Sequence, residues 1–208
     1  MEEFVTSYKL ASDFINNNDN WVLYWRNPIL LFKSLGWEVI PYKKEDWKNL
    51  SIEAYSSYKY DNFHILYCED NYSTRINYNF HHEGGHIISA HPILYPDVLC
   101  KSSKDTEKQF LEISATVVGR NVFLPAFIIN HIIECYPHLD ISIIKEYFRE
   151  TYCLSKQYIN IRFKFISKDL KNMSYPKIIH DEACKECMNF VRWFLKRSNG
   201  RKIKKINF

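Results

Sequence analysis

The residues with the clearest chemical meaning are two histidines four positions apart, His82 and His86, with Glu83 directly after the first. In a helix, side chains four residues apart lie on one face, so both imidazoles can bind one Zn²⁺ ion at about 2.0–2.1 Å. The Glu83 carboxylate can then reach a water bound to the metal and act as a general base, while the metal lowers the pKa of that water. The spacing therefore predicts a zinc site with hydrolytic chemistry.

Two adjacent glycines, Gly84 and Gly85, lie between the motif histidines. Each costs about 1 kcal/mol relative to alanine in the interior of a helix. A helix with a purely structural role has little reason to accept that cost, whereas a site that needs close approach of backbone or substrate does. The glycines thus favour a functional interpretation over a chance match to the His-Glu-x-x-His pattern.

A catalytic zinc ion needs a third protein ligand and an open position. His91 lies five residues after His86, so it would point away from the ligand face of a continuing helix. The remaining source is a carboxylate on the next predicted helix, residues 105–121, where Glu112 and Glu107 are the candidates. Spacing alone leaves the choice between these two glutamates open.

The motif block at residues 75–91, RINYNFHHEGGHIISAH, resembles that of the ImmA/IrrE family of metallopeptidases. In that family a second block has a Glu, a nearby Ala and an apolar helix that ends in a Leu-Pro element. Here EISA at residues 112–115 is followed by VFLP at residues 122–125. Residues 154–162 are similar to the family's small helical segment with a Ser-x-x-apolar-x-x-Arg pattern. The resemblance covers about residues 25–170.

The resemblance implies a gluzincin-like site in which His82, His86 and Glu112 bind Zn²⁺ and Glu83 is the general base. It favours Glu112 over Glu107 as the third ligand. It also implies a zinc-dependent endopeptidase whose partner is a protein substrate, such as a helix-turn-helix transcriptional repressor of a mobile element or of a stress response in bacteria.

Three positions depart from the family pattern. Gly84 stands where a bulky apolar residue is usual, and Ser114 and Thr116 stand where an acidic residue and an asparagine are common. The first departure could loosen the motif helix, and the other two could alter the hydrogen bonds that orient the ligands. The candidates for groups that stabilise the transition state, each more often a packed or surface residue, are His64, Tyr95 and Arg75.

Cys184 and Cys187, with His180 four residues before, have the spacing of half a zinc knuckle. A structural zinc site needs four ligands, and no second C-x-x-C pair follows. We therefore interpret the pair as partly buried thiols on the last helix. The alternative is a metal shared between two subunits, or one with Cys153 as a further ligand.

The chain of 208 residues has a net charge of +4, but residues 196–208 hold six basic residues and no acidic one. Subtracting these six leaves −2 for residues 1–195. A nucleic-acid-binding face over the whole domain is therefore not expected, and the tail offers at most a weak, salt-dependent contact. With no cationic start, and with apolar runs shorter than the roughly 18 residues that cross a bilayer, we expect a cytoplasmic protein without a membrane partner.

Hydrophobic periodicity predicts an α+β fold, in which a small sheet packs on a zincin-type motif helix and a mostly helical region follows. The expected strands span residues 37–42 and 63–68, with a loop at 14–20 and a loop or irregular hairpin at 43–62. The expected helices span residues 28–36, 75–90, 105–121, 125–133, 140–149, 155–165 and 181–196. A loop is expected after Pro92, and Phe110, Ile113 and Val117 are spaced to face the core.

These elements group into three expected parts. They are a metallopeptidase-like core at residues 1–125, a helical extension packed on it at residues 126–195, and the basic tail at 196–208. Two other functions fit the same sequence. One is a zinc-containing regulatory or antitoxin-like binding module with little or no hydrolysis. The other is a nucleic-acid-binding protein that uses its tail and the helix at residues 155–170, although the aromatic content of that helix favours a core role.

Overall fold

A three-stranded mixed sheet forms the β part of this α+β fold. The computed structural model describes residues 5–45 and 53–206. The strands are β1 (Glu38–Tyr42), β2 (Ala54–Lys59) and β3 (Asn62–Cys68). They lie in the order β1-β3-β2, with β1 parallel and β2 antiparallel to β3. The two predicted strands are confirmed, and the undecided segment between them contributes β2.

A two-residue turn joins β2 to β3. Tyr60 and Asp61 both have positive φ angles, 52° and 55°, between the paired residues Lys59 and Asn62. Two such residues match the tight hairpin turn whose twist follows that of the strands. Of the strands described, β2 lies at one edge of the sheet, with its outer side facing away from β3.

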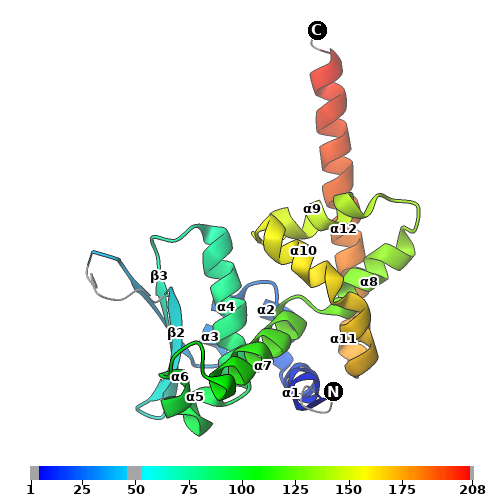
Figure 1. The fold of residues 1–208 in the computed structure, drawn as a ribbon. Coiled ribbons are helices and arrows are strands. Elements are labelled where there is room, and N and C mark those ends of the chain that lie inside the picture. The colour runs from blue at the N-terminus through cyan, green and yellow to red at the C-terminus, as the bar shows by residue number, and fades with distance from the viewer. Residues whose placement is uncertain (1–4, 46–52, 207–208) are drawn as a thin grey trace.

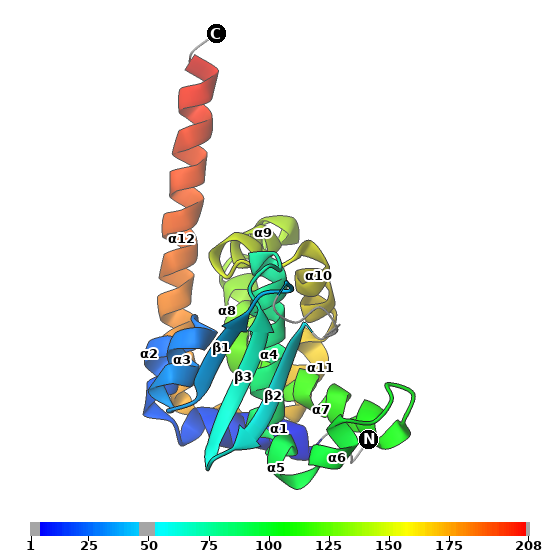
Figure 2. The same cartoon turned by 90° about the vertical axis from the view of Figure 1, so that its left-hand side faces the viewer.

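The described part of the chain has twelve helices, and in Figure 2 the sheet lies in front of them with one face uncovered. The first seven are α1 (Val5–Asn16), α2 (Asp19–Tyr24), α3 (Pro28–Ser34), α4 (Ser73–Ile88), α5 (His91–Leu94), α6 (Pro96–Leu99) and α7 (Thr106–Phe123). The other five are α8 (Ala126–Cys135), α9 (Ile141–Thr151), α10 (Lys156–Lys164), α11 (Ile166–Asn172) and α12 (Lys177–Ile206). The side chains of Asp105, Asp140 and Ser155 cap α7, α9 and α10, because each accepts a hydrogen bond from a backbone N–H of the first turn.

Three expectations about the elements were wrong. The loop expected at residues 14–20 is only a short break, because Asn18 caps α2 with its side chain. The loop expected after Pro92 is instead the short helices α5 and α6, since Pro92 and Pro96 stand in their first turns, where proline needs no N–H partner. The last helix begins at Lys177 and is longer than residues 181–196 at both ends.

The motif helix α4 lies between the sheet and α7. It packs on β2 and β3 with one side and on α7 with the other, as Figures 1 and 2 show. Phe80 and Ile87 of α4 are buried there, together with Ile65 of β3 and Val118 of α7. Helix α4 is thus held on two sides, which fixes the direction in which its histidines point.

Helix α7 does not bury the whole face that its sequence pattern suggests. Val117 is buried as expected, but Phe110 is 39% exposed and Ile113 is 50% exposed. The prediction that these two residues face the core was wrong, because this half of α7 borders a surface hollow that Ile113 lines. Apolar periodicity cannot distinguish a core face from the wall of an open hollow.

A buried ionic network ties α7 to three other helices. The carboxylate of Asp169 on α11 pairs with Arg120 of α7 at 2.7 Å and with Arg162 of α10 at 2.5 Å. The hydroxyl of Tyr8 on α1 donates to the same carboxylate at 2.7 Å. Arg162 and its neighbour Tyr158 are both buried, as expected for a helix with a core role.

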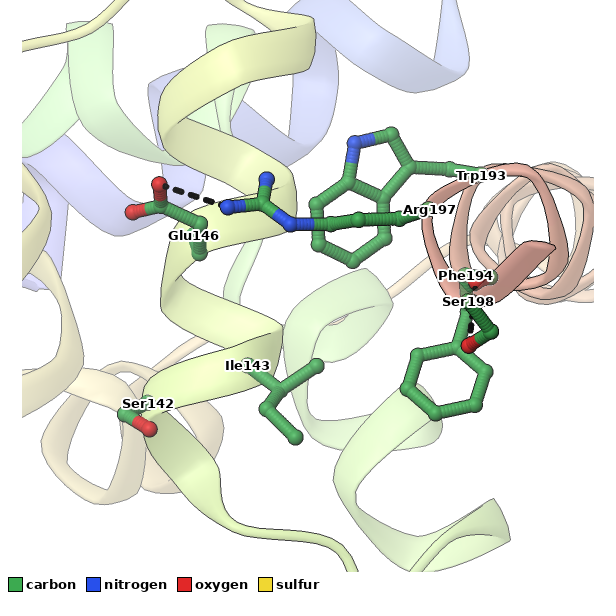
Figure 3. A pocket seen from close by; sticks show the side chains of 7 residues that line it. All are labelled: Ser142, Ile143, Glu146, Trp193, Phe194, Arg197 and Ser198. Carbon is green, nitrogen blue, oxygen red and sulfur yellow. Dashed lines mark hydrogen bonds and ion pairs between the residues drawn. The ribbon is translucent and has the colours of Figure 1, made fainter. Parts of the chain in front are cut away.

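Helix α12 packs on α8 and then projects from the rest of the fold (Figures 1 and 2). Close to where it projects, Arg197 pairs with Glu150 of α9 at 2.6 Å, and with Glu146 at 3.6 Å. Trp193 donates its indole N–H to Glu150 at 3.0 Å. A hollow of about 280 Å³ lies between the two helices here (Figure 3). These contacts hold α12 against α9.

Among the residues that the structure describes, no single helix is both long and apolar enough to cross a membrane. The helices α7 and α8 pass that test only as a pair, across a bend of 48°. Many of their apolar side chains are buried inside the fold.

Protonation of Asp169 is expected to destabilise the fold. Burial raises the pKa of Asp169, but the charges of Arg162 and Arg120 outweigh burial, and the net shift is downward. A carboxyl with a depressed folded-state pKa stabilises the fold above its unfolded value of about 3.9, and this stabilisation is lost as the pH falls. Asp169→Asn should lower the free energy of unfolding by about 3–5 kcal/mol at pH 7.

The difference in the free energy of unfolding between Asp169→Asn and wild type should then shrink as the pH is lowered from about 5 to about 2. Protonation of Asp169 removes from the wild type the carboxylate charge that the variant already lacks. Urea unfolding at a series of pH values measures this difference. Glu107→Gln, at an exposed site, is the control. It should change neither the free energy of unfolding at pH 7 nor the dependence of that free energy on pH. A difference that stays constant down to pH 2 would contradict the prediction.

Candidate metal centre

The side chains of His82, His86 and Glu112 meet between α4 and α7. The Nε2 atom of His82 lies 2.8 Å from Oε2 of Glu112 and 3.2 Å from Nε2 of His86, and Nε2 of His86 lies 3.5 Å from Oε2 of Glu112. Ligands bound tetrahedrally at about 2.0–2.1 Å are about 3.3–3.4 Å apart. The three atoms therefore fit a zinc ion with little movement. Glu107 lies outside this triad and pairs with Lys101 at 3.0 Å.

The triad depends on a close approach of the backbones of α4 and α7. A Cβ atom at Gly85 would lie 2.0 Å from the carbonyl oxygen of Ala115. A Cβ atom at Gly119 would lie 2.0 Å from the carbonyl oxygen of His81. Neither position can accept a larger residue while the helices stay in place. The close backbone approach expected for the motif glycines is confirmed at Gly85, and the approaching backbone belongs to α7.

Gly84 has a different environment. A Cβ atom there would lie 2.8–2.9 Å from ring atoms of Phe123 and Phe32. These rings occupy the space that a bulky side chain at position 84 would need. The motif helix is therefore tightly packed at Gly84, and the loosening that we expected from this departure was wrong.

Thr116 orients the first ligand. Its hydroxyl donates to the backbone carbonyl oxygen of Glu112 at 2.8 Å and lies 3.3 Å from Nδ1 of His82. Because a hydroxyl has one hydrogen, it accepts from the Nδ1–H of His82. In the neutral ring this leaves Nε2 unprotonated and directed at the triad, which is the tautomer that binds a metal. Ser114, by contrast, bonds to Ser7 of α1 at 2.9 Å and does not contact a ligand.

His91 orients the second ligand. The helix does not continue as assumed, because α4 ends at Ile88 and Ala90 has a φ angle of 56°. The chain turns there, so the condition on which His91 was expected to point away does not hold, although His91 is not one of the three triad residues. Nδ1 of His91 lies 2.9 Å from Nδ1 of His86, the ring nitrogen that faces away from the triad. The sequence analysis missed this contact, because it depends on a turn at Ala90 that no local sequence pattern predicts.

The carboxylate of Glu112 and the imidazoles of His82 and His86 shift one another's pKa values. Hydrogen bonds with His82 and His86 hold the pKa of the Glu112 carboxyl well below its usual range. Burial lowers the pKa of His82, but the hydrogen bond with Glu112 and the charges of Glu83 and Glu112 outweigh it, and the net shift is upward. Burial, followed by the charge of His86, lowers the pKa of His91 to about 3. The triad thus stabilises positive charge at its centre, which suits a cation.

Glu83 lies beside the triad at the meeting point of two surface hollows. It is buried, with 8% of its surface exposed. One hollow has a volume of about 500 Å³ and the other about 1030 Å³. Both are lined by Ala54, His82, Glu83, Lys108 and Glu112. The predicted base and two predicted ligands are therefore shared between the hollows.

The three candidates for transition-state stabilisation are not brought together. Arg75 lines the larger hollow, where it pairs with Glu53. His64 lies on the sheet and pairs with Glu38 at 3.0 Å. Tyr95 lies between α5 and α6 and lines neither hollow. Of the three, only Arg75 is placed where it could contact a substrate at the triad, so it alone stays a candidate for transition-state stabilisation.

Tyr55 on β2 is a lining residue that sequence reasoning missed. It borders the smaller hollow together with Glu83 and His86. Burial, then the neighbouring Cys100 thiol and the charge of Glu83, raise the pKa of Tyr55, so the phenol keeps its proton. The signal that could have found it is the strand pattern before the two-residue turn, which we did not separate from a loop.

Comparisons of the chain with models of known protein families, with curated proteins and with solved structures gave no match. The chemistry of the site therefore rests on the residues of this chain alone.

Gly85→Ala is expected to force α4 and α7 apart. The added Cβ overlaps a backbone carbonyl oxygen, which cannot rotate away as a side chain can. We expect the free energy of unfolding to fall by about 3 kcal/mol or more and zinc affinity to fall at least about tenfold. Gly84→Ala is the matched comparison, with a smaller loss because phenylalanine rings can shift. Urea unfolding and zinc titration measure both, and wild-type stability for Gly85→Ala would be the contrary result.

Thr116→Val tests the orienting hydrogen bond to His82. The substitution keeps the shape of the side chain and removes the acceptor, so zinc affinity should fall about 10–100-fold with the helices intact. Ser114→Ala, which removes a hydroxyl that contacts no ligand, should leave zinc affinity unchanged. Competition with a chromophoric chelator measures the affinity, and circular dichroism checks the fold. Equal affinities for the two variants would refute the role of Thr116.

Proposed function

We propose that this chain is a zinc-dependent endopeptidase that hydrolyses a peptide bond in a protein substrate. The observation that carries the proposal is the triad of His82, His86 and Glu112, whose ligand atoms lie 2.8–3.5 Å apart with Glu83 beside them. Three protein ligands leave a fourth position open, as in catalytic rather than structural zinc sites. The position of α4 between a small sheet and α7 supports a zincin-type arrangement.

His82, His86 and Glu112 would hold the zinc ion. When bound, the ion supplies a Lewis acid that polarises the carbonyl of the substrate and lowers the pKa of water. The Glu83 carboxylate takes a proton from the attacking water and returns it to the nitrogen of the leaving amine. The water oxygen bonds to the carbonyl carbon as Glu83 takes the first proton, and that proton reaches the amine nitrogen as the C–N bond breaks, while the second water proton leaves with the new carboxyl group. Tyr55 provides an O–H donor in the same hollow.

The shape of the site supports cleavage within a chain. Because the two hollows meet at the triad, a substrate can extend on both sides of the reacting bond. Residues 54–56 of β2 line the smaller hollow, and the edge of this strand, which pairs with no second strand among the described residues, offers backbone hydrogen bonds to an extended peptide. Ile113 and Ile161, which are 50% and 43% exposed, give the larger hollow an apolar wall for substrate side chains.

The substrate class follows from the resemblance to the ImmA/IrrE family at residues 75–91 and 112–125. On that basis we propose a helix-turn-helix repressor, cleaved in a segment that is extended or locally unfolded. The six cysteines are free, which supports a reducing, cytoplasmic compartment. The alternative is a zinc-containing regulatory or antitoxin-like binding module, which would use the triad but not the carboxylate of Glu83.

Three glutamate substitutions separate these functions. Glu83→Gln should keep the zinc bound by the triad and lower the cleavage rate by about 100-fold or more, because the general base is lost. Glu112→Gln should lose both that zinc and cleavage. Glu107→Gln, on the same helix but outside the triad, should leave both unchanged. Cleavage of a proteome-derived peptide library, with new N-termini read by mass spectrometry, gives the rate, and elemental analysis gives the zinc content.

Each outcome decides between the candidates. Wild-type cleavage by Glu83→Gln would exclude Glu83 as the base and with it the proposed mechanism. Zinc retained by a wild-type protein that cleaves neither the library nor any co-expressed repressor would favour the binding module. Zinc retained by Glu112→Gln at wild-type affinity would remove Glu112 from the ligand set.

A further inference from the structure

A second group of metal-ligating side chains lies between α8 and α12, which contribute nothing to the triad. His131 and Cys135 are four residues apart on α8, and Cys184 and Cys187 are three apart on α12. Both spacings place the two side chains on one face of a helix. The ligand atoms of His131, Cys135 and Cys187 all lie within 4.8 Å of one another.

The side chain of Cys184 also contacts His131. Nε2 of His131 is 3.7 Å from Sγ of Cys135 and 3.8 Å from Sγ of Cys184. In a tetrahedral zinc site with Zn–S of about 2.3 Å and Zn–N of about 2.0–2.1 Å, nitrogen and sulfur are about 3.6 Å apart. The ligand atoms of His131, Cys135 and Cys187 therefore lie at separations that an ion can bridge with small side-chain movements. Sγ of Cys184 lies beside His131 but outside that mutual group, and rotation of its side chain would bring it to the same ion.

We propose that His131, Cys135, Cys184 and Cys187 form a structural zinc site of the Cys₃His type. Four protein ligands fill the tetrahedral shell, so the site has no open position for chemistry. Sulfur and imidazole ligands select zinc over magnesium, calcium or manganese. The ring of Phe127, one turn before His131, lies nearly parallel to the imidazole, with 6.3 Å between the ring centroids.

The structure corrects the interpretation of this motif from sequence. His180 is not part of the group, because its ring packs on Phe127 at 4.3 Å. The alternative with Cys153 as a further ligand was wrong, since its Sγ lies 3.1 Å from the hydroxyl of Ser73 on α4. The other two proposed ligands are His131 and Cys135, which come much earlier in the sequence and do not form a C-x-x-C pair.

The site would cross-link two packed helices. Helix α12 packs on α8 and then projects from the fold (Figure 1), so an ion bound here would tie the base of the projecting helix to α8. A metal that binds the folded chain and not the unfolded one stabilises the folded state. Cys135 and Cys184 are exposed, which gives the ion a route into the site.

Cobalt(II) distinguishes this site from the triad. Thiolate ligands give cobalt an intense charge-transfer band, and a triad of nitrogen and oxygen ligands does not. The reduced, metal-free full-length protein should bind two equivalents of cobalt, and the band should saturate with one. Added zinc should displace the cobalt and abolish the band, because zinc binds thiolates more tightly than cobalt does.

Matched variants assign the band to residues. Cys184→Ser and Cys187→Ser should each weaken the band and lower cobalt affinity at least about tenfold. Cys153→Ser, which changes a cysteine outside the group, should leave the band unchanged. The double variant His82→Asn, His86→Asn should lose one equivalent of cobalt and keep the band, so failure of the proposed peptidase function and failure of this site are separable.

Three results would overturn the proposal. The first is a reduced wild-type protein that binds cobalt without a thiolate band. The second is a band of full intensity in both cysteine variants of α12. The third is a disulfide between Cys135 and Cys187, found by mass spectrometry in protein purified from a reducing cytoplasm with free thiols blocked.

Discussion

The distance between the backbones of α4 and α7 is the constraint on which the candidate metal centre depends. Two ligands come from α4 and one from α7, so the helix separation sets the distances within the triad. Gly85 and Gly119 allow a separation that any Cβ atom would prevent. Each glycine costs about 1 kcal/mol in helix propensity, and the contact between the helices offsets that cost through burial on both sides.

Helix α7 serves two purposes along its length, and this explains why its exposed apolar residues were misjudged. Its second half is anchored in the core, where Arg120 pairs with the buried Asp169. Its first half carries Glu112 and borders the larger hollow with Ile113. A helix fixed at one end can present ligands at the other with little loss of position. The hydroxyl of Thr116 lies between the two halves and links Glu112 to His82.

How much could be predicted from sequence depended on the distance along the chain between the partners. The His82–His86 pair follows from helical spacing, and Glu112 from a family pattern, so the triad could be named in advance. The contact of His91 with His86 required a turn at Ala90, and β2 required a register that weak alternation does not specify. The Cys₃His group was half visible, because Cys184 and Cys187 are local while His131 lies far back in the sequence.

The two candidate metal sites are connected through helix α2 (Asp19–Tyr24) and its C-terminal flank. Glu182 and Glu186 of α12 are buried and pair with Arg26 at 3.0 and 2.8 Å. Trp21, a turn earlier, donates its indole N–H to the backbone of Val122 on α7 at 2.9 Å. Contacts through Trp21 and the partly exposed Arg26 thus connect α12 with the end of α7 that is anchored in the core. An ion that ties α12 to α8 would therefore restrain, at a distance, the helix that supplies the third ligand of the triad.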